Sequence, residues 1–349
     1  MSAFSPAMIT AKALGAMPAF ALSELGQRKT LRIMSGAGLV EKFVSEREGF
    51  IPEFALCEFV AGVSRELGED NLGLLFSPFL TVADYGAWGD YVLSAPDLGT
   101  ALKRAQQEMR LHSCTDRVQF VTFNNLASYS YAFGLKAHPT YPNMAFSAVA
   151  AMLSIPKHFL GKDWAPLKIE FDFPAGNRET AAEDTFGCPV LFGGSKLRLL
   201  FDKTVLHAPN PDPNVIQKTT RNDILRERSA LPTNFPNSAR SVVELHLAAQ
   251  DVSLERLAQS MGIGPRGVQR QLSRHGTGFR QILNESRMKR AQDLLGMKGS
   301  TVASVSEALG YEEPGNFSRA FARYFGVSPT KFASAASPHS ILNLDRPSK

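Results

Sequence analysis

The sequence predicts two domains of different class: an α+β N-terminal domain, followed by an all-α C-terminal domain in which a linker helix joins two helix-turn-helix units. Three observations support this prediction. At 349 residues the chain is too long for one typical hydrophobic core. Before Pro213, apolar residues follow helical spacing in some segments and alternation in others. The C-terminal part of the chain contains one short pattern twice.

Changes in these patterns divide the chain into segments. They are an N-terminal extension over 1–29, the α+β domain over 30–213, a helix and linker over 214–238, the helix-turn-helix domain over 239–335 and a loose tail over 336–349. A run of alternating prolines ends the second segment, and a run containing proline and asparagine forms the linker.

Both kinds of spacing occur in the α+β domain. Residues 30–80 carry apolar clusters at helical spacing, and Asp97 is placed to cap a helix that follows it. Residues 117–133 nearly alternate around Asn124-Asn125, which predicts a β-hairpin. Helices are also expected over 141–153 and 215–229, and strands over 167–173, 189–192 and 197–201.

The repeated C-terminal unit is a short amphipathic segment, a glycine turn and a second amphipathic segment with arginines between its apolar positions. When Gly262 is aligned with Gly310 and one residue is inserted in the second turn, Arg270 falls on Arg319. This is the pattern of a helix-turn-helix, and two in tandem indicate that the partner is double-stranded DNA. Ordinary amphipathic helices with solvated arginines would explain one such unit, but they explain two matched units poorly.

The second helix of each unit supplies the candidate DNA contacts. Arg266, Gln269 and Arg270 face outward on neighbouring turns, and arginine and glutamine can bond guanine and adenine bidentately. In the second unit, Asn316 and Arg319 occupy the equivalent outer face. The candidates for phosphate contacts are Arg274, Arg323 and Lys331.

A longer helix is expected between the two units. Its 18 residues over 279–296 span roughly 27 Å. With the helices at each end, the two reading helices can lie about one DNA turn apart, near 34 Å. One monomer could then contact two successive major grooves.

The net charge of +5 lies entirely in the last third of the chain. From Ser241 onward there are 14 Lys and Arg against 9 Asp and Glu, while the rest of the chain is balanced at 24 of each. A neutral body with a basic end suits a polyanion-binding domain joined to another domain. A solvated basic face would look similar, so charge supports the assignment without deciding it.

Other classes of protein lack support in the sequence. The three cysteines are isolated and no metal-ligand spacing occurs, which indicates a reducing cytoplasm and no metal site. No apolar run approaches the roughly 20 residues of a membrane span, and no signal peptide is evident. The catalytic motifs GxSxG, HExxH, GxGxxG and the P-loop are absent, so we expect neither an enzyme nor a cofactor.

The N-terminal domain nevertheless contains side chains that suit an apolar pocket. Trp88, Tyr129 and Tyr131 could form its walls, and His138 follows the hairpin and could line it. Core packing is the alternative for the three aromatic residues, and a surface turn is the alternative for His138.

The residues above carry a resemblance to a known family. The segment 253–332 resembles the C-terminal domain of the AraC/XylS family of bacterial transcription regulators. The matching stretches are Arg266–Leu272, Gly276–Phe279, Arg287–Ala291, Gly310–Phe321 and Tyr324–Pro329. The resemblance implies tandem helix-turn-helix units whose base-contacting positions are Arg266, Gln269, Arg270, Pro314, Gly315, Asn316 and Arg319. Polar residues are common at the positions of Pro314 and Gly315, so we expect the first unit to read sequence more strongly.

The N-terminal domain resembles the arabinose-operon-regulator-like effector-binding and dimerisation domain of one branch of these regulators. The similar stretches are Leu93–Leu102, Trp164–Pro166, Phe186–Val190 and Leu206–Pro213. The resemblance implies a small-molecule effector of unknown identity, a homodimer, and activation of transcription through RNA polymerase. The sequence therefore predicts a ligand-responsive, sequence-specific transcription factor. Two alternatives stay open, a dimeric regulator with no effector and an enzyme with a DNA-binding tail.

Overall fold

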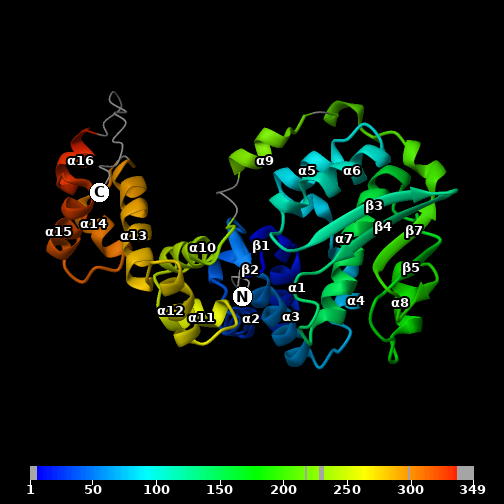
Figure 1. Cartoon of the computed structure of the whole chain (residues 1–349), viewed down its shortest axis with the longest axis horizontal. Helices are drawn as coiled ribbons and strands as arrows, with labels where there is room; N and C mark the ends of the chain where they lie inside the picture. The colour runs from blue at the N-terminus through cyan, green and yellow to red at the C-terminus, as the bar shows by residue number, and fades with distance from the viewer. Residues whose placement is uncertain (1–5, 217, 228–231, 298, 336–349) are drawn as a thin grey trace.

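The computed structural model describes residues 6–216, 218–227, 232–297 and 299–335. It contains a mixed α/β N-terminal domain and a helical C-terminal domain, which confirms the predicted fold class (Figure 1). The predicted tail over 336–349 lies outside the described residues.

A mixed five-stranded sheet forms one side of the N-terminal domain. Its strands are β3 (Arg117–Phe123), β4 (Leu126–Ala132), β5 (Lys168–Glu170), β6 (Val190–Leu191) and β7 (Leu197–Asp202). They lie in the order β3-β4-β7-β5-β6, and all neighbours are antiparallel except β5 and β6. The β3–β4 hairpin turns at Asn124-Asn125 as predicted, with Asn124 at a φ of 50°, a conformation that asparagine tolerates in tight hairpins.

Helices cover this sheet and form the rest of the domain. They are α1 (Met17–Leu25), α2 (Gln27–Gly36), α3 (Glu53–Leu67), α4 (Leu72–Phe76), α5 (Ala87–Leu93), α6 (Leu98–Glu108), α7 (Tyr141–Leu160), α8 (Glu179–Phe186) and α9 (Arg221–Glu227). Asp97 caps α6 as predicted, because its Oδ1 accepts a hydrogen bond from the Thr100 amide at 2.7 Å. The helix expected to end at 153 continues to Leu160, and the helix expected over 215–229 is limited to α9 in the described residues.

Residues 8–25, which the sequence places in an N-terminal extension, are packed into the fold in the structure. Strands β1 (Met8–Thr10) and β2 (Phe50–Pro52) form a two-stranded antiparallel ribbon, and all six residues are buried. The boundary expected at 30 therefore falls inside the fold. A three-residue strand is too short to show alternation, which explains why its sequence gives no strand signal.

The C-terminal domain consists of helices. They are α10 (Phe235–Ala248), α11 (Leu254–Ser260), α12 (Pro265–Arg274), α13 (Phe279–Leu295), α14 (Val302–Ala308), α15 (Pro314–Phe325) and α16 (Pro329–Ala335). Helix α10 begins before the boundary expected at 239, because Asn234 caps it. One apolar core lies around α10 to α12 and a second around α14 and α15. The first lies against the N-terminal domain and the second at the far end of the molecule (Figure 1).

Candidate nucleic-acid interface and internal cavity

The first helix-turn-helix is formed by α11 and α12. The side chain of Ser253 caps α11 by accepting a hydrogen bond from the Arg256 amide at 3.0 Å. Gly262 makes the turn at a φ of +65°, a conformation that favours glycine, and Pro265 begins α12. Val268 and Leu272 are fully buried, so the opposite face of α12 points to solvent.

That opposite face carries the predicted first-unit contacts. Arg266, Gln269, Arg270 and Arg274 are all exposed. Within the described part of the chain, no ion pair or side-chain hydrogen bond engages any of the four. Their donors are therefore available to a polyanion without first breaking an internal contact.

The second unit, α14 and α15, has the same construction. Thr301 and Ser304 form a reciprocal capping box, and Gly310 turns at a φ of +70°. On the exposed face of α15, the Arg319 Nη2 atom donates to Asn316 Oδ1 at 2.5 Å. The two residues predicted to contact bases in this unit are therefore hydrogen-bonded to each other, whereas those on α12 are not.

Two further features distinguish the second unit. Glu312 and Glu313 are exposed just before α15, which places acidic charge near its N-terminus. Arg323 and Lys331, the phosphate candidates, are exposed on α15 and α16. Their exposure leaves both side chains accessible to a DNA backbone, and the weaker base reading expected of the second unit stays a prediction.

Helix α13 joins the units and is anchored to the second turn by a contact that the sequence did not reveal. Its 17 residues span about 26 Å. The guanidinium of Arg287 lies over the ring of Tyr311, 4.9 Å from its centroid. Arg287 belongs to a stretch that resembles the family, and this stacking gives that arginine a structural contact.

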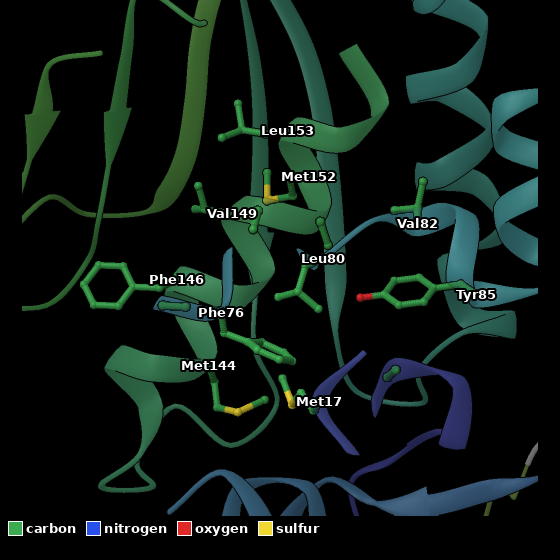
Figure 2. Packing of buried hydrophobic residues seen from close by; sticks show 14 of the residues in the cluster. Met17, Phe76, Leu80, Val82, Tyr85, Met144, Phe146, Val149, Met152 and Leu153 are labelled. Carbon is green, nitrogen blue, oxygen red and sulfur yellow. The ribbon is translucent and has the colours of Figure 1, made fainter. Parts of the chain in front are cut away.

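The N-terminal domain encloses an apolar cavity of about 70 Å³. Trp88, Tyr129 and Tyr131 line it, as the sequence predicts. Its other walls include Met17 from α1, Met144 and Met152 from α7, and Leu80 and Tyr85 from the segment before α5, all labelled in Figure 2. The elements that bear the walls include β1, β3, β4, α1, α5 and α7, so the cavity lies between the helices and the sheet.

His138 is not among the residues that line this cavity. Its Nε2 lies 3.2 Å from Glu58 Oε1, and its ring packs edge-on against Phe54 at 5.5 Å. The position of His138 directly after the hairpin suggested a pocket residue, but its partners come from α3, which is distant in sequence.

Two polar groups of the cavity wall are bonded to other protein groups, whereas the Tyr85 hydroxyl points inward among the lining residues in Figure 2. Trp88 Nε1 donates to the Glu108 carbonyl at 2.9 Å, and the Tyr131 hydroxyl donates to Asp116. The His112 ring lies between Tyr85 and Trp88, with centroid distances of 4.8 and 5.0 Å. Burial raises the pKa of Tyr85, so its hydroxyl stays neutral. None of the described residues that line the cavity is Lys, Arg, Asp or Glu.

Two buried carboxyl groups lie behind this wall. Glu53 Oε1 accepts hydrogen bonds from the hydroxyls of Ser113 and Thr115, each at 2.8 Å. Burial, and then the facing Asp116 carboxylate, raise the pKa of Glu53 to about 8. Burial also raises the pKa of Asp116. The pair is therefore expected to hold one proton at neutral pH, with Glu53 as the acid.

The first helix-turn-helix is bonded directly to the N-terminal domain. Three side chains of α11 donate to backbone carbonyls at and after the end of α2. Arg256 Nη1 donates to the Ser35 oxygen at 3.3 Å, Gln259 Nε2 to the Gly36 oxygen at 2.7 Å, and Ser260 Oγ to the Gly38 oxygen at 2.8 Å. Because helical C-terminal carbonyls lack intrahelical partners, these donors complete α2 while fixing α11.

The structure contains neither a metal-type cluster nor a bilayer-spanning helix in the parts that it describes. No three His, Cys, Asp or Glu side chains in the described ranges gather so as to hold a metal ion. No helix among the same residues has both the length and the apolar character to cross a membrane.

The sensor-like domain and tandem units define a helix-turn-helix transcription regulator. Residues 29–210 match the family described as the arabinose-binding domain of the AraC transcription regulator, N-terminal, and 257–335 match a helix-turn-helix domain family. The first match covers more than half of the chain. The chain therefore belongs to the AraC family of transcription regulators.

Individual relatives have regulatory names. An uncharacterized HTH-type transcriptional regulator of Mycobacterium tuberculosis is 31% identical over 147 residues, 41% of this chain and 42% of that protein. The chain thus spans less than half the length of this relative. The ornithine utilization regulator of Pseudomonas aeruginosa is 22% identical over 77% of this chain and 80% of that protein. The crystal structure of the P. aeruginosa transcriptional regulator CdpR matches at 21% identity with a TM-score of 0.38, over 76% of this chain and 87% of that chain.

Proposed function

We propose that this protein is a sequence-specific DNA-binding transcription factor controlled by a small molecule. The observation that carries the proposal is the pair of helix-turn-helix units with exposed, unpaired polar side chains on α12. Family membership supports the same reading. The length of α13 suits units that enter successive major grooves of one promoter.

We assign base reading mainly to the first unit. Arg266, Gln269 and Arg270 would contact base edges, because their exposed donors lie on neighbouring turns of α12. In the second unit the bonded pair Asn316 and Arg319 would contribute less. The proposed phosphate contacts are Arg274, Arg323 and Lys331.

The proposed effector site is the N-terminal cavity lined by Trp88, Tyr129 and Tyr131. The family domain is described as arabinose-binding, which supports a small-molecule ligand. A sugar, however, needs many hydrogen-bonding partners, whereas this cavity is lined mainly by apolar side chains and the polar atoms of Trp88 and Tyr131 are already bonded to protein groups. We therefore do not extend arabinose to this chain.

Four further parts of the proposal are supported by family membership and the regulatory names of the relatives. They are self-association as a homodimer, activation through RNA polymerase, a cytoplasmic location and the absence of enzymatic activity. Light scattering of the purified protein, with and without DNA, tests the first of these directly.

The deciding experiment is selection of genomic fragments by the purified full-length protein at moderate salt. The Arg266→Ala/Arg270→Ala double variant is run beside it, and Arg110→Ala, an exposed arginine of the N-terminal domain, is the matched control. Fragments sharing a motif, retained by wild type and the control but lost in the double variant, are expected. Uniform retention by all three proteins would contradict sequence-specific reading by α12.

A further inference from the structure

The β1–β2 ribbon has one face in each domain. Strand residues alternate in direction, so neighbours along β1 point to opposite sides. Met8 and Phe50 belong to the apolar core of the first helix-turn-helix, together with Val242 and Leu272. Ile9, by contrast, lines the N-terminal cavity.

The pairing register agrees with this division. Ile9 lies opposite Ile51, and both are buried in the N-terminal core. Met8 and Phe50 are 0% and 2% exposed, so the core of the first unit is completed by residues from the N-terminal domain. The ribbon is therefore a wall formed by a single layer of two strands, and it separates the cavity from the DNA-binding unit.

A third segment extends the wall on the other side of β1. The Thr10 amide donates to the His112 oxygen at 2.9 Å, and the Cys114 amide donates to the Met8 oxygen at 2.8 Å. His112 lines the cavity, whereas Cys114 packs against the core of the first unit and its Sγ donates to the Pro232 oxygen at 3.1 Å. This segment therefore contacts the cavity through His112 and the core of the first unit through Cys114. A displacement on the cavity side can reach the first unit through these contacts.

The cavity is too small for an effector unless a wall moves. Its volume is about 70 Å³, whereas an apolar cavity of roughly 150 Å³ is known to hold benzene. Its described lining contains no Lys, Arg, Asp or Glu, and His112 is its only side chain that can carry a charge near neutral pH, which disfavours a charged ligand. Protein interiors are close-packed, so a ligand of metabolite size must push neighbouring elements apart.

We propose that the cavity binds a compact, neutral, mostly apolar molecule, and that binding displaces the β1–β2 ribbon against the core of the first helix-turn-helix. DNA affinity then changes because the ligand favours an arrangement in which this unit packs differently on the ribbon. Among the described residues, the core of the second unit includes none from the N-terminal domain and shares only Val252 and Leu283 with the core of the first unit, so we expect the second unit to respond less. This inference rests on the effector site of the proposed function.

The test uses the full-length protein with two neutral probes, benzyl alcohol and 1-octanol, and their charged counterparts benzoate and octanoate. Binding is measured by calorimetry, and amide hydrogen exchange is followed in peptides covering 8–10, 50–52, 235–274 and 302–325. The neutral probes are expected to bind and to change exchange at least about fivefold in the ribbon and first unit, but not over 302–325. Binding of the charged probes alone, no binding, or binding without exchange changes in the first unit would overturn the inference.

Variants that fill the cavity supply a second test. Ala148→Leu and Ala151→Leu add volume at two lining positions of α7, so each is expected to weaken probe binding at least about tenfold. Ala150→Leu is the matched control, because Ala150 is buried on the same helix but lines a separate groove. Equal weakening by the control would contradict the assigned site, and two lining variants guard against the failure of one to fold.

DNA binding measured in the same samples separates the two proposals. If the protein selects no DNA motif either with or without a bound probe, the proposed function fails, while binding and exchange still report on the cavity. If the protein selects a motif but probes bind without altering exchange in the first unit, only the inference about the ribbon fails.

Discussion

Arginines on the outer face of α12 are expected to differ in what they contact. Arg270→Ala should cost about 1–3 kcal/mol at a specific site and relax the preference at one base pair, because a bidentate contact to a base edge is lost. Arg274→Ala should weaken binding to all DNA sequences alike, and it should reduce the slope of log affinity against log salt concentration by about 1. Titrations against single-base variants of the selected site, at several salt concentrations, distinguish the two.

Arg110→Ala serves as the control for charge alone, since Arg110 is exposed on the other domain. Uniform weakening by Arg270→Ala, with no base position relaxed, would assign that side chain to phosphate instead.

The two turn glycines provide a second comparison between single residues. Gly262 and Gly310 both have positive φ, so alanine at either position should cost about 1–2 kcal/mol in backbone strain. Only at Gly262 would the added Cβ lie 2.6 Å from the ring of Phe54, a residue of the N-terminal domain. Gly262→Ala should therefore lower the melting temperature more than Gly310→Ala, as measured by scanning calorimetry.

The background variant Phe54→Ala removes the ring that the new Cβ would meet. In that background, Gly262→Ala and Gly310→Ala should lower the melting temperature by the same amount. A difference that persists would mean that the contact between the turn and α3 is not its cause.

At the scale of elements, a hydrogen bond to the segment just after α2 helps to fix the position of α11. Ser260 is fully buried, and its Oγ donates to the Gly38 oxygen at 2.8 Å and lies 3.0 Å from His246 Nε2. Ser260→Ala should cost about 1–3 kcal/mol, because the buried partners lose their hydrogen bond. Hydrogen exchange should also quicken in α11.

Ser306, on α14, is the matched control for this substitution. It is 1% exposed, and its Oγ has no hydrogen-bond partner among the residues that the structure describes. Ser306→Ala should be neutral or slightly stabilising in the same melting experiment. An equal loss in both variants would show that the serine volume, not the bond to Gly38, accounts for the effect.

Elements with strong local patterns could be predicted from the sequence. The hairpin at Asn124-Asn125, the cap at Asp97 and the repeated glycine turns each depend on residues close in sequence. The ribbon could not be predicted, because its strands are three residues long and more than forty residues separate Thr10 from Phe50. The same reason explains why Met8 was not expected in the core of the first helix-turn-helix.

At the scale of the whole molecule, the sequence predicts two domains but not their shared core. Charge places the polyanion-binding end correctly in the C-terminal domain of the fold, because net charge depends only on composition. The attachment of α11 to the end of α2 depends on contacts across more than 200 residues, which no local spacing encodes. Regulation through such an attachment therefore has to be argued from the structure.

The stability of the assembled molecule should fall as pH rises, because of the buried acid at the end of the ribbon. Glu53 directly follows β2, and its pKa is raised from an ordinary value of 4.5 to about 8, chiefly by burial and then by Asp116. A group whose pKa is higher in the folded than in the unfolded chain favours the fold fully below the unfolded value. That contribution is lost as pH rises from about 4.5 through about 8.

The melting temperature of the wild-type protein should therefore decrease between pH 5 and pH 8.5, approximately the window set by these two pKa values. Glu53→Gln should flatten this decrease and melt higher than wild type at the alkaline end, because an amide keeps a donor toward Asp116 without ionising.

Glu48→Gln, at an exposed position close to β2, should retain the wild-type slope. If Glu53→Gln retained that slope too, the proton on this pair would not couple to folding. If protection of the ribbon against exchange, after correction for the intrinsic rise of amide exchange with pH, falls only in the wild type and the Glu48→Gln control, then ionisation of the pair loosens the ribbon on which the first helix-turn-helix packs.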